Sequence, residues 1–294
     1  MNLISKLFTS FFLFFYMTSV SQEIYQNDYI GNLTIYDTIQ LSYRIEFNID
    51  KQKIIGFSYT DIGGADETKS KIIGTYDKVT KIVTFKEKEI TYTKSIFNEN
   101  DFCFVNAKAK LKIKKNKSLL TGDFTGTLSD GSKCIDGKFT LINIKTAKKK
   151  LNQLTKKVNK SKFISKKDKE KFNNTNLLEQ LKPSILNENE NLTLFWKTNY
   201  VKLEIWDNKK EDNDRISVNI NGKDILVNYI LKNKKKYLKV ALNKDKNIIK
   251  IYANNEGYAP PNTATINLVN EYKIVNLTTS LKAFKTTTIT LIKR

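Results

Sequence analysis

The 294-residue sequence contains no histidine and has two cysteines. The absence of histidine excludes Ser-His-Asp and Cys-His catalysis, histidine general bases and zinc sites with imidazole ligands. Two cysteines are too few for a four-cysteine zinc site. Composition alone therefore removes the enzyme and zinc-protein classes that depend on these residues.

Arginine is also scarce, with three residues (Arg44, Arg215 and Arg294) among the 51 cationic side chains and a formal net charge of +21. Recognition of bases and bidentate recognition of phosphates both favour arginine over lysine. We therefore expect no nucleic-acid partner, in spite of the strong positive charge.

Long apolar runs are rare, and the clearest one occupies residues 7–17, directly after Lys6. A short apolar run behind a positive charge, followed by small residues, is typical of a secretory signal peptide. We predict a signal peptide over residues 1–21, cleaved before Gln22. A membrane anchor is the alternative, although the run is shorter than the roughly 20 residues that a span needs. We expect an exported protein of the periplasm, cell surface or extracellular space.

Export places the two cysteines in an oxidising compartment, which favours a disulfide between Cys103 and Cys134. Such a bond would contribute about 3 kcal/mol in the chain-entropy model. Two buried free thiols are the alternative.

Residues 22–144 contain about eight short strand-like runs separated by turn residues. Residues 41–47 (LSYRIEF) show the apolar–polar alternation of a half-buried strand, and residues 129–132 (SDGS) are typical of a turn. A meander of this kind removes its exposed edges by closing into a barrel. We predict an antiparallel up-and-down, lipocalin-like barrel, with an open sandwich as the alternative.

Residues 145–186 form a lysine-rich linker. Positions 145–182 hold 13 lysines against three acidic residues, and leucines at helical spacing indicate two weak helices before Pro183. A block of like charges is usually a solvated linker. The alternative is a tether to an anionic surface, which would be salt-sensitive.

Strand-like runs return over residues 187–294, and Asn221-Gly222 between two of them is a strong signal for a tight hairpin. This many short strands in about 100 residues predict a β-sandwich of jelly-roll or immunoglobulin-like kind. The expected fold class is all-β throughout, with a barrel and a sandwich joined by the partly helical linker.

Two groups of sequence motifs, one in each domain, resemble motifs of known proteins. The first domain carries DIGG (61–64), ETKS (67–70), YTKS (92–95) and FCFV (102–105), and the second carries LEIWD (203–207), DND (212–214), NG (221–222), NEG (255–257) and PPNTA (260–264). These motifs resemble uncharacterised secreted two-domain β-proteins of flavobacterial type. The resemblance implies an envelope or extracellular protein and carries no reaction with it. One departure is Asn213, where the module more often has glycine, although asparagine tolerates the left-handed backbone.

An acidic loop follows the strand-like run at residues 201–206. Its carboxylates, Asp207, Asp212 and Asp214, together with Glu256 from a second loop, would offer the closely spaced oxygens that calcium needs. The spacing is not that of an EF-hand. A solvated turn, in which the aspartates accept backbone hydrogen bonds, is the alternative. Calcium is the one cofactor that the sequence suggests.

Two sets of aromatic residues are candidates for ligand binding, and in both cases core packing is the alternative. The first would line a cavity inside the barrel, and the second would stack on sugar rings. The first set is Tyr43, Phe47, Phe57, Tyr76, Phe85, Phe124 and Phe139, and the second is Trp196, Tyr200, Trp206 and Tyr258.

The sequence thus predicts an exported, non-enzymatic binding or adhesion protein, whose partner is a small ligand, a glycan or an envelope protein. A structural component of the cell envelope, acting through protein contacts, is the main alternative. A glycoside hydrolase based on paired carboxylates needs no histidine, but it is less favoured because two small β-domains offer no obvious long cleft. We expect no catalytic residues.

Overall fold

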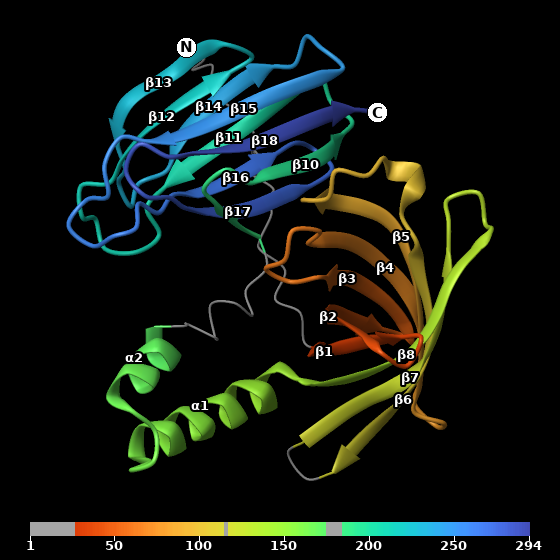
Figure 1. Ribbon diagram of the computed structural model, residues 1–294. Coiled ribbons are helices and arrows are strands. Elements are labelled where there is room, and N and C mark those ends of the chain that lie inside the picture. The colour runs from red at the N-terminus through yellow and green to blue at the C-terminus, as the bar shows by residue number, and fades with distance from the viewer. Residues whose placement is uncertain (1–26, 115–116, 175–183) are drawn as a thin grey trace, which may run out of the picture.

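The computed structural model describes residues 27–114, 117–174 and 184–294. It consists of a barrel, two helices and a sandwich (Figure 1). The predicted signal peptide, residues 1–21, lies outside the described residues, as do Leu177, Leu178 and Leu181 of the second predicted linker helix.

Eight strands make the barrel. Each strand pairs antiparallel with the next along the chain, and the pairings β1–β8 and β5–β6 close the circle. The up-and-down barrel predicted from the strand pattern is therefore confirmed. The strands are β1 (Asn27–Ile35), β2 (Ile39–Asp50), β3 (Lys53–Thr60), β4 (Thr68–Asp77), β5 (Ile82–Thr93), β6 (Phe104–Lys114), β7 (Lys117–Thr127) and β8 (Lys133–Asn143), with a short 3-10 helix, η1 (Glu99–Asp101), before β6.

Alternation along each strand sends one set of side chains into the barrel and the other outward. In β2 the inward residues Tyr43, Ile45 and Phe47 are at most 2% exposed, whereas Arg44 and Glu46 between them are partly exposed. The inward residues of all eight strands form a single apolar cluster. This cluster is the first of the two cores of the molecule.

Two sheets face one another in the second domain. One has the strand order β13-β12-β15-β18-β10 and the other β14-β11-β16-β17-β9, and the second core lies between them. The predicted sandwich is therefore present. Its strands are β9 (Ile185–Asn187), β10 (Asn191–Trp196), β11 (Tyr200–Trp206), β12 (Arg215–Ile220), β13 (Lys223–Ile230), β14 (Lys236–Ala241), β15 (Lys246–Ala253), β16 (Thr265–Val269), β17 (Ile274–Ser280) and β18 (Thr286–Lys293).

Local turn chemistry in the sandwich follows the sequence closely. Asn221 and Gly222 connect β12 to β13 with φ angles of 52° and 91°, because a two-residue hairpin that matches the strand twist requires positive φ at both positions. Asn213 has φ of 71°, so asparagine does adopt the left-handed backbone expected at this position. The peptide bond between Pro260 and Pro261 is cis.

The lysine-rich segment forms two helices that lie apart from both cores (Figure 1). Helix α1 (Ile144–Lys160) follows β8 directly, and Asn143 caps it by accepting a hydrogen bond from the Lys145 backbone N–H at 3.0 Å. Its buried residue is Ile144, at the barrel end. Helix α2 (Lys166–Asn174) follows after a short connection.

Barrel and sandwich share a polar junction. The end of β5 pairs with β10 through Thr93 and Thr193, and the Tyr92 ring is buried in the sandwich core. Glu67 accepts hydrogen bonds from the Tyr92 hydroxyl at 2.9 Å and from the Ser184 backbone N–H at 2.8 Å. The two domains are thus joined by specific contacts in addition to the covalent linker.

Candidate functional site

The barrel interior is filled by its own side chains. Of the seven aromatic residues considered as lining for a cavity, six point inward and are between 0% and 9% exposed: Tyr43, Phe47, Tyr76, Phe85, Phe124 and Phe139. A water-sized cavity against these rings would leave surface exposed on them. These six aromatics are therefore packed core residues, and two of them, Phe85 and Phe124, also border the hollow described below.

The seventh aromatic residue, Phe57, lies on the outer face of β3. The Lys69 ammonium lies 4.1 Å from the centre of its ring, and the same ammonium is 4.9 Å from the Tyr59 ring. Burial lowers the pKa of Lys69 to about 8, more than the negative charge of Glu46 raises it. Phe57 therefore contributes to a cation–π arrangement on the outside wall.

Glu87 is a polar residue inside the barrel that the sequence analysis missed. One carboxylate oxygen accepts hydrogen bonds from Ser58 Oγ at 2.6 Å and Tyr43 Oη at 3.0 Å, and the other accepts one from the Val105 backbone N–H at 2.8 Å. Burial raises the pKa of Glu87, although the hydrogen bonds lower it. The only sequence signal is the alternation of β5, which places Glu87 inward between two exposed lysines. All contacts of the carboxylate are internal, so we assign it a structural role.

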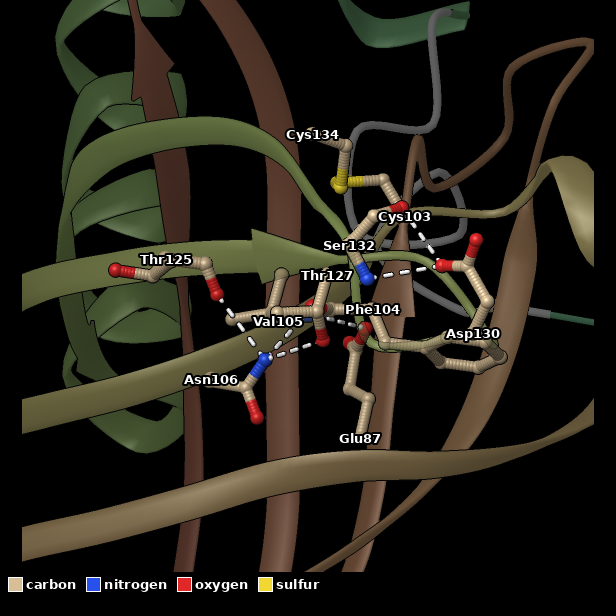
Figure 2. The surroundings of a disulfide bond; sticks show 10 residues. All are labelled: Glu87, Cys103, Phe104, Val105, Asn106, Thr125, Thr127, Asp130, Ser132 and Cys134. Carbon is tan, nitrogen blue, oxygen red and sulfur yellow. Dashed lines mark hydrogen bonds between the residues drawn. A yellow bond between two sulfur atoms is a disulfide. The ribbon is translucent and has the colours of Figure 1, made fainter.

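The predicted disulfide joins Cys103 and Cys134, with their Cα atoms 6.1 Å apart (Figure 2). It connects the start of β6 to β8 and passes over Gly126 of β7, the strand between them. A Cβ on Gly126 would overlap Cys103 Sγ and would lie 3.0 Å from Cys134 Sγ. Glycine is therefore required at this position because the sulfur atoms occupy the space of a side chain.

A hollow of about 750 Å³ lies on the outer wall of the barrel. Residues of five neighbouring strands, β3 to β7, line it, and they include the inward-facing Ile54, Phe85, Ala107 and Phe124 beside outward-facing residues. Its floor includes the backbone at Gly74, and the apolar side chains of Ile55 and Ile73 are 55% and 41% exposed beside it. A hollow of this volume is in the size range of small-molecule sites.

The charges around the hollow are mostly positive. Lys53, Lys86 and Lys108 line it from three strands, against the single carboxylate of Asp123. None of the four has an ion pair among the described residues. An apolar floor with a net positive lining suits a ligand that combines an apolar body with an anionic group.

The acidic loop predicted as a calcium site is partly assembled. Asp207 and Asp214 are both 2% exposed, and Asp212 is partly exposed. Asp207 Oδ1 accepts a hydrogen bond from the Lys209 backbone N–H at 2.8 Å, as in an aspartate-stabilised turn. Glu256 lies in the facing loop with a partly exposed side chain. In the part of the chain that the structure describes, no three His, Cys, Asp or Glu side chains are grouped to hold a metal ion.

The four aromatic residues considered for sugar stacking differ in their exposure. Trp196 is 0% exposed and its Nε1 donates to the Tyr200 carbonyl at 2.9 Å, whereas Tyr258 is 84% exposed. Trp206 is partly exposed with the Lys235 ammonium 4.6 Å from its ring centre. Trp196 is a core residue and is therefore removed from the sugar-binding hypothesis.

Within the described residues, no helix has the length and apolar character needed to cross a membrane. Comparison of the chain with protein-family models, with curated proteins and with solved structures gave no match.

Proposed function

We propose that this chain is an exported, non-enzymatic binding protein of the cell envelope or extracellular space. Its ligand is a small amphipathic anion, with an apolar body and a carboxylate, sulfate or phosphate group. The observation that carries the proposal is the outer-wall hollow, whose lining combines exposed Ile55 and Ile73 with three lysines.

The energetics favour such a ligand. Exposed apolar side chains release about 25 cal/mol for each Å² that a ligand covers. An anionic group near Lys53, Lys86 and Lys108 gains further attraction, which is screened by salt because these side chains are exposed. The filled barrel interior also supports a site on the outside, because the lipocalin-like location is occupied by core residues.

Titration with sodium dodecanoate below its micellar concentration, followed by isothermal calorimetry at low salt, tests the proposal. We expect saturable binding of one dodecanoate per chain that weakens as salt is added. Dodecyltrimethylammonium has the same tail with the opposite charge, and we expect at least tenfold weaker binding for it. Equal binding of both amphiphiles would contradict the assigned charge preference.

Matched variants locate the site. Lys86→Glu reverses one charge, and the double variant Ile55→Ser/Ile73→Ser removes apolar surface from the hollow. Each should weaken dodecanoate binding about tenfold. Controls with equally exposed side chains elsewhere are Lys223→Glu and Ile39→Ser. If no variant changes the affinity, the hollow is not the site. If dodecanoate does not bind and the chain instead dimerises through Ile55 and Ile73, the assembly alternative replaces our proposal.

A second observation favours the tether predicted for the lysine-rich linker. Helix α1 carries seven lysines in its sequence, IKTAKKKLNQLTKKVNK, with no acidic residue in it. We propose that it brings the protein to anionic envelope surfaces. Sedimentation with vesicles containing phosphatidylglycerol should show binding that is lost at high salt, and vesicles of phosphatidylcholine alone should not bind.

A further inference from the structure

Carboxylate oxygens without a hydrogen-bond partner are buried at one end of the sandwich. Asp212 Oδ1 and Asp214 Oδ1 are both inaccessible to solvent and accept no hydrogen bond from the residues that the structure describes. Burying an anionic oxygen without a partner is costly, and each such atom in a folded protein calls for an explanation.

The two carboxylates are fixed side by side by the facing loop. Asp212 Oδ2 accepts the Ala259 backbone N–H at 3.0 Å, and Asp214 Oδ2 accepts the Thr263 backbone N–H at 2.8 Å. Each aspartate therefore uses one oxygen to hold the loop and keeps the other free. A Cβ on Gly257 would lie 2.8 Å from Asp214 Oδ1 and 3.0 Å from the Asp212 carboxyl carbon, so both groups flank this one glycine.

A neutral oxygen on the same loop is also unpartnered. Asn262 is 0% exposed, and its Nδ2 donates to the carbonyls of Arg215 and Asn255 at 3.0 Å each. Its Oδ1 is buried and has no hydrogen-bond partner among the described residues. The side-chain amide thus holds the start of β12 to the loop that carries Gly257. Asn262 directly precedes Thr263, whose N–H holds Asp214, so this unpartnered oxygen belongs to the same loop.

No cationic side chain in the described ranges forms an ion pair with these carboxylates. Neither aspartate forms an ion pair within the ranges that the structure describes, whereas Glu211 on the same loop pairs with Lys232 at 3.3 Å. The two buried carboxylate oxygens therefore have no counter-ion among the described side chains.

We propose that Asp212 and Asp214 bind a divalent cation of the calcium class, with Asn262 as a further oxygen donor. Calcium takes six to eight oxygen ligands in flexible geometry, so water would complete the shell. This site differs from the one predicted from sequence. Asp207 is occupied by its own turn, Glu256 is partly exposed, and the donor set has two carboxylates and an amide where the sequence suggested four carboxylates.

Thermal melts of the chelator-stripped full chain in calcium chloride and in EDTA test the proposal. Calcium at about 100 times its dissociation constant should raise the melting temperature by roughly 5–10 °C. Potassium chloride at matched ionic strength should not. Equilibrium dialysis against radioactive calcium should give one ion per chain, a measurement that does not depend on stability. Identical melts together with no bound calcium would overturn the proposal.

Isosteric variants assign the ligands. Asp212→Asn and Asp214→Asn keep an oxygen to accept the loop N–H groups, and each should reduce calcium binding at least tenfold. Glu211→Gln is the matched control in the same loop, and Glu256→Gln separates this site from the four-carboxylate one; both should bind calcium normally. If Glu256→Gln abolishes binding, or both aspartate variants retain it, the assignment is wrong. These outcomes do not depend on the outer-wall hollow.

Discussion

Lys94 Nζ lies 2.8 Å from Glu190 Oε2, across the junction between the barrel and the sandwich. The Lys94 side chain is 3% exposed, and the same ammonium donates to the Ile185 carbonyl at 2.7 Å. The residue just after β5 is thereby held to β9 and to the turn before β10. Since Lys94 belongs to the YTKS motif, part of the first-domain motif serves the contact with the second domain.

Removing either partner of this pair should destabilise the protein, but unequally. Glu190→Gln leaves a buried ammonium without its counter-ion and should cost about 3 kcal/mol of unfolding free energy. Lys94→Met leaves a carboxylate that is 26% exposed, so water can replace part of the lost interaction and the cost should be about 1–2 kcal/mol. Urea denaturation of the full chain measures both losses.

The control is Lys282→Met, which breaks a more exposed ion pair with Glu188 and should cost less than about 0.5 kcal/mol. A larger loss for Lys94→Met than for Glu190→Gln would contradict this account.

The same pair predicts a pH dependence. Burial raises the pKa of Glu190, but hydrogen bonds from Lys94 and Asn187 outweigh it, and the net pKa lies below the ordinary value of 4.5. A lowered carboxyl pKa contributes stability that is present above pH 4.5 and is lost as the pH falls through the folded-state pKa. The melting temperatures of wild type and Lys94→Met should therefore converge between pH 5 and pH 3. A constant difference across this range would show that the ion pair is not the cause.

Gly126 and the disulfide should be strongly coupled. Replacing both Cys103 and Cys134 by alanine should cost about 3–4 kcal/mol, from the entropy of the 31-residue loop. Gly126→Ala should cost about 2–3 kcal/mol in the disulfide-bonded protein, because the new methyl group overlaps the sulfur atoms. In the double-alanine background the cost should fall by at least about 1 kcal/mol. Additive losses would mean that the disulfide does not restrict residue 126.

Export can be checked on the protein itself. If residues 1–21 are a cleaved signal peptide, intact-mass measurement of the protein recovered from the periplasm or medium of an expressing bacterium should give a chain that starts at Gln22. Thiol labelling of the denatured, unreduced protein should find no free cysteine. A chain that starts at Met1 and stays with the membrane fraction would favour the anchor.

Local pattern determined much of this fold. The alternation in residues 41–47, the hairpin at Asn221-Gly222 and the left-handed turn at Asn213 all follow from backbone preferences that act over a few residues. The disulfide was also predictable, because the chain offers a single possible pairing and export favours oxidation. Strand count and the need to cover sheet edges then sufficed for a barrel and a sandwich.

Tertiary structure decided which side chains face the barrel interior and which face outward. Phe57 faces outward while its neighbours Gly56 and Ser58 face inward, where Ser58 donates a hydrogen bond to the buried Glu87 of another strand. Alternation divides the residues of a strand between two faces. It does not tell which face is the inner one when, as in β3, a large aromatic residue lies on the outer face.

The candidate sites depend even more on long-range contacts. Acidic residues 207–214 were visible in the sequence, but the choice between a solvated turn and a cation site rests on which oxygens the facing loop leaves unpartnered. That loop lies about 40 residues further along the chain, as the Asn255–Arg215 hydrogen bond shows. Hydrogen-bond partners at this separation are set by how the two sheets pack, so the sequence determined the elements and their turns, and only the packed structure determined which polar atoms remain free to bind.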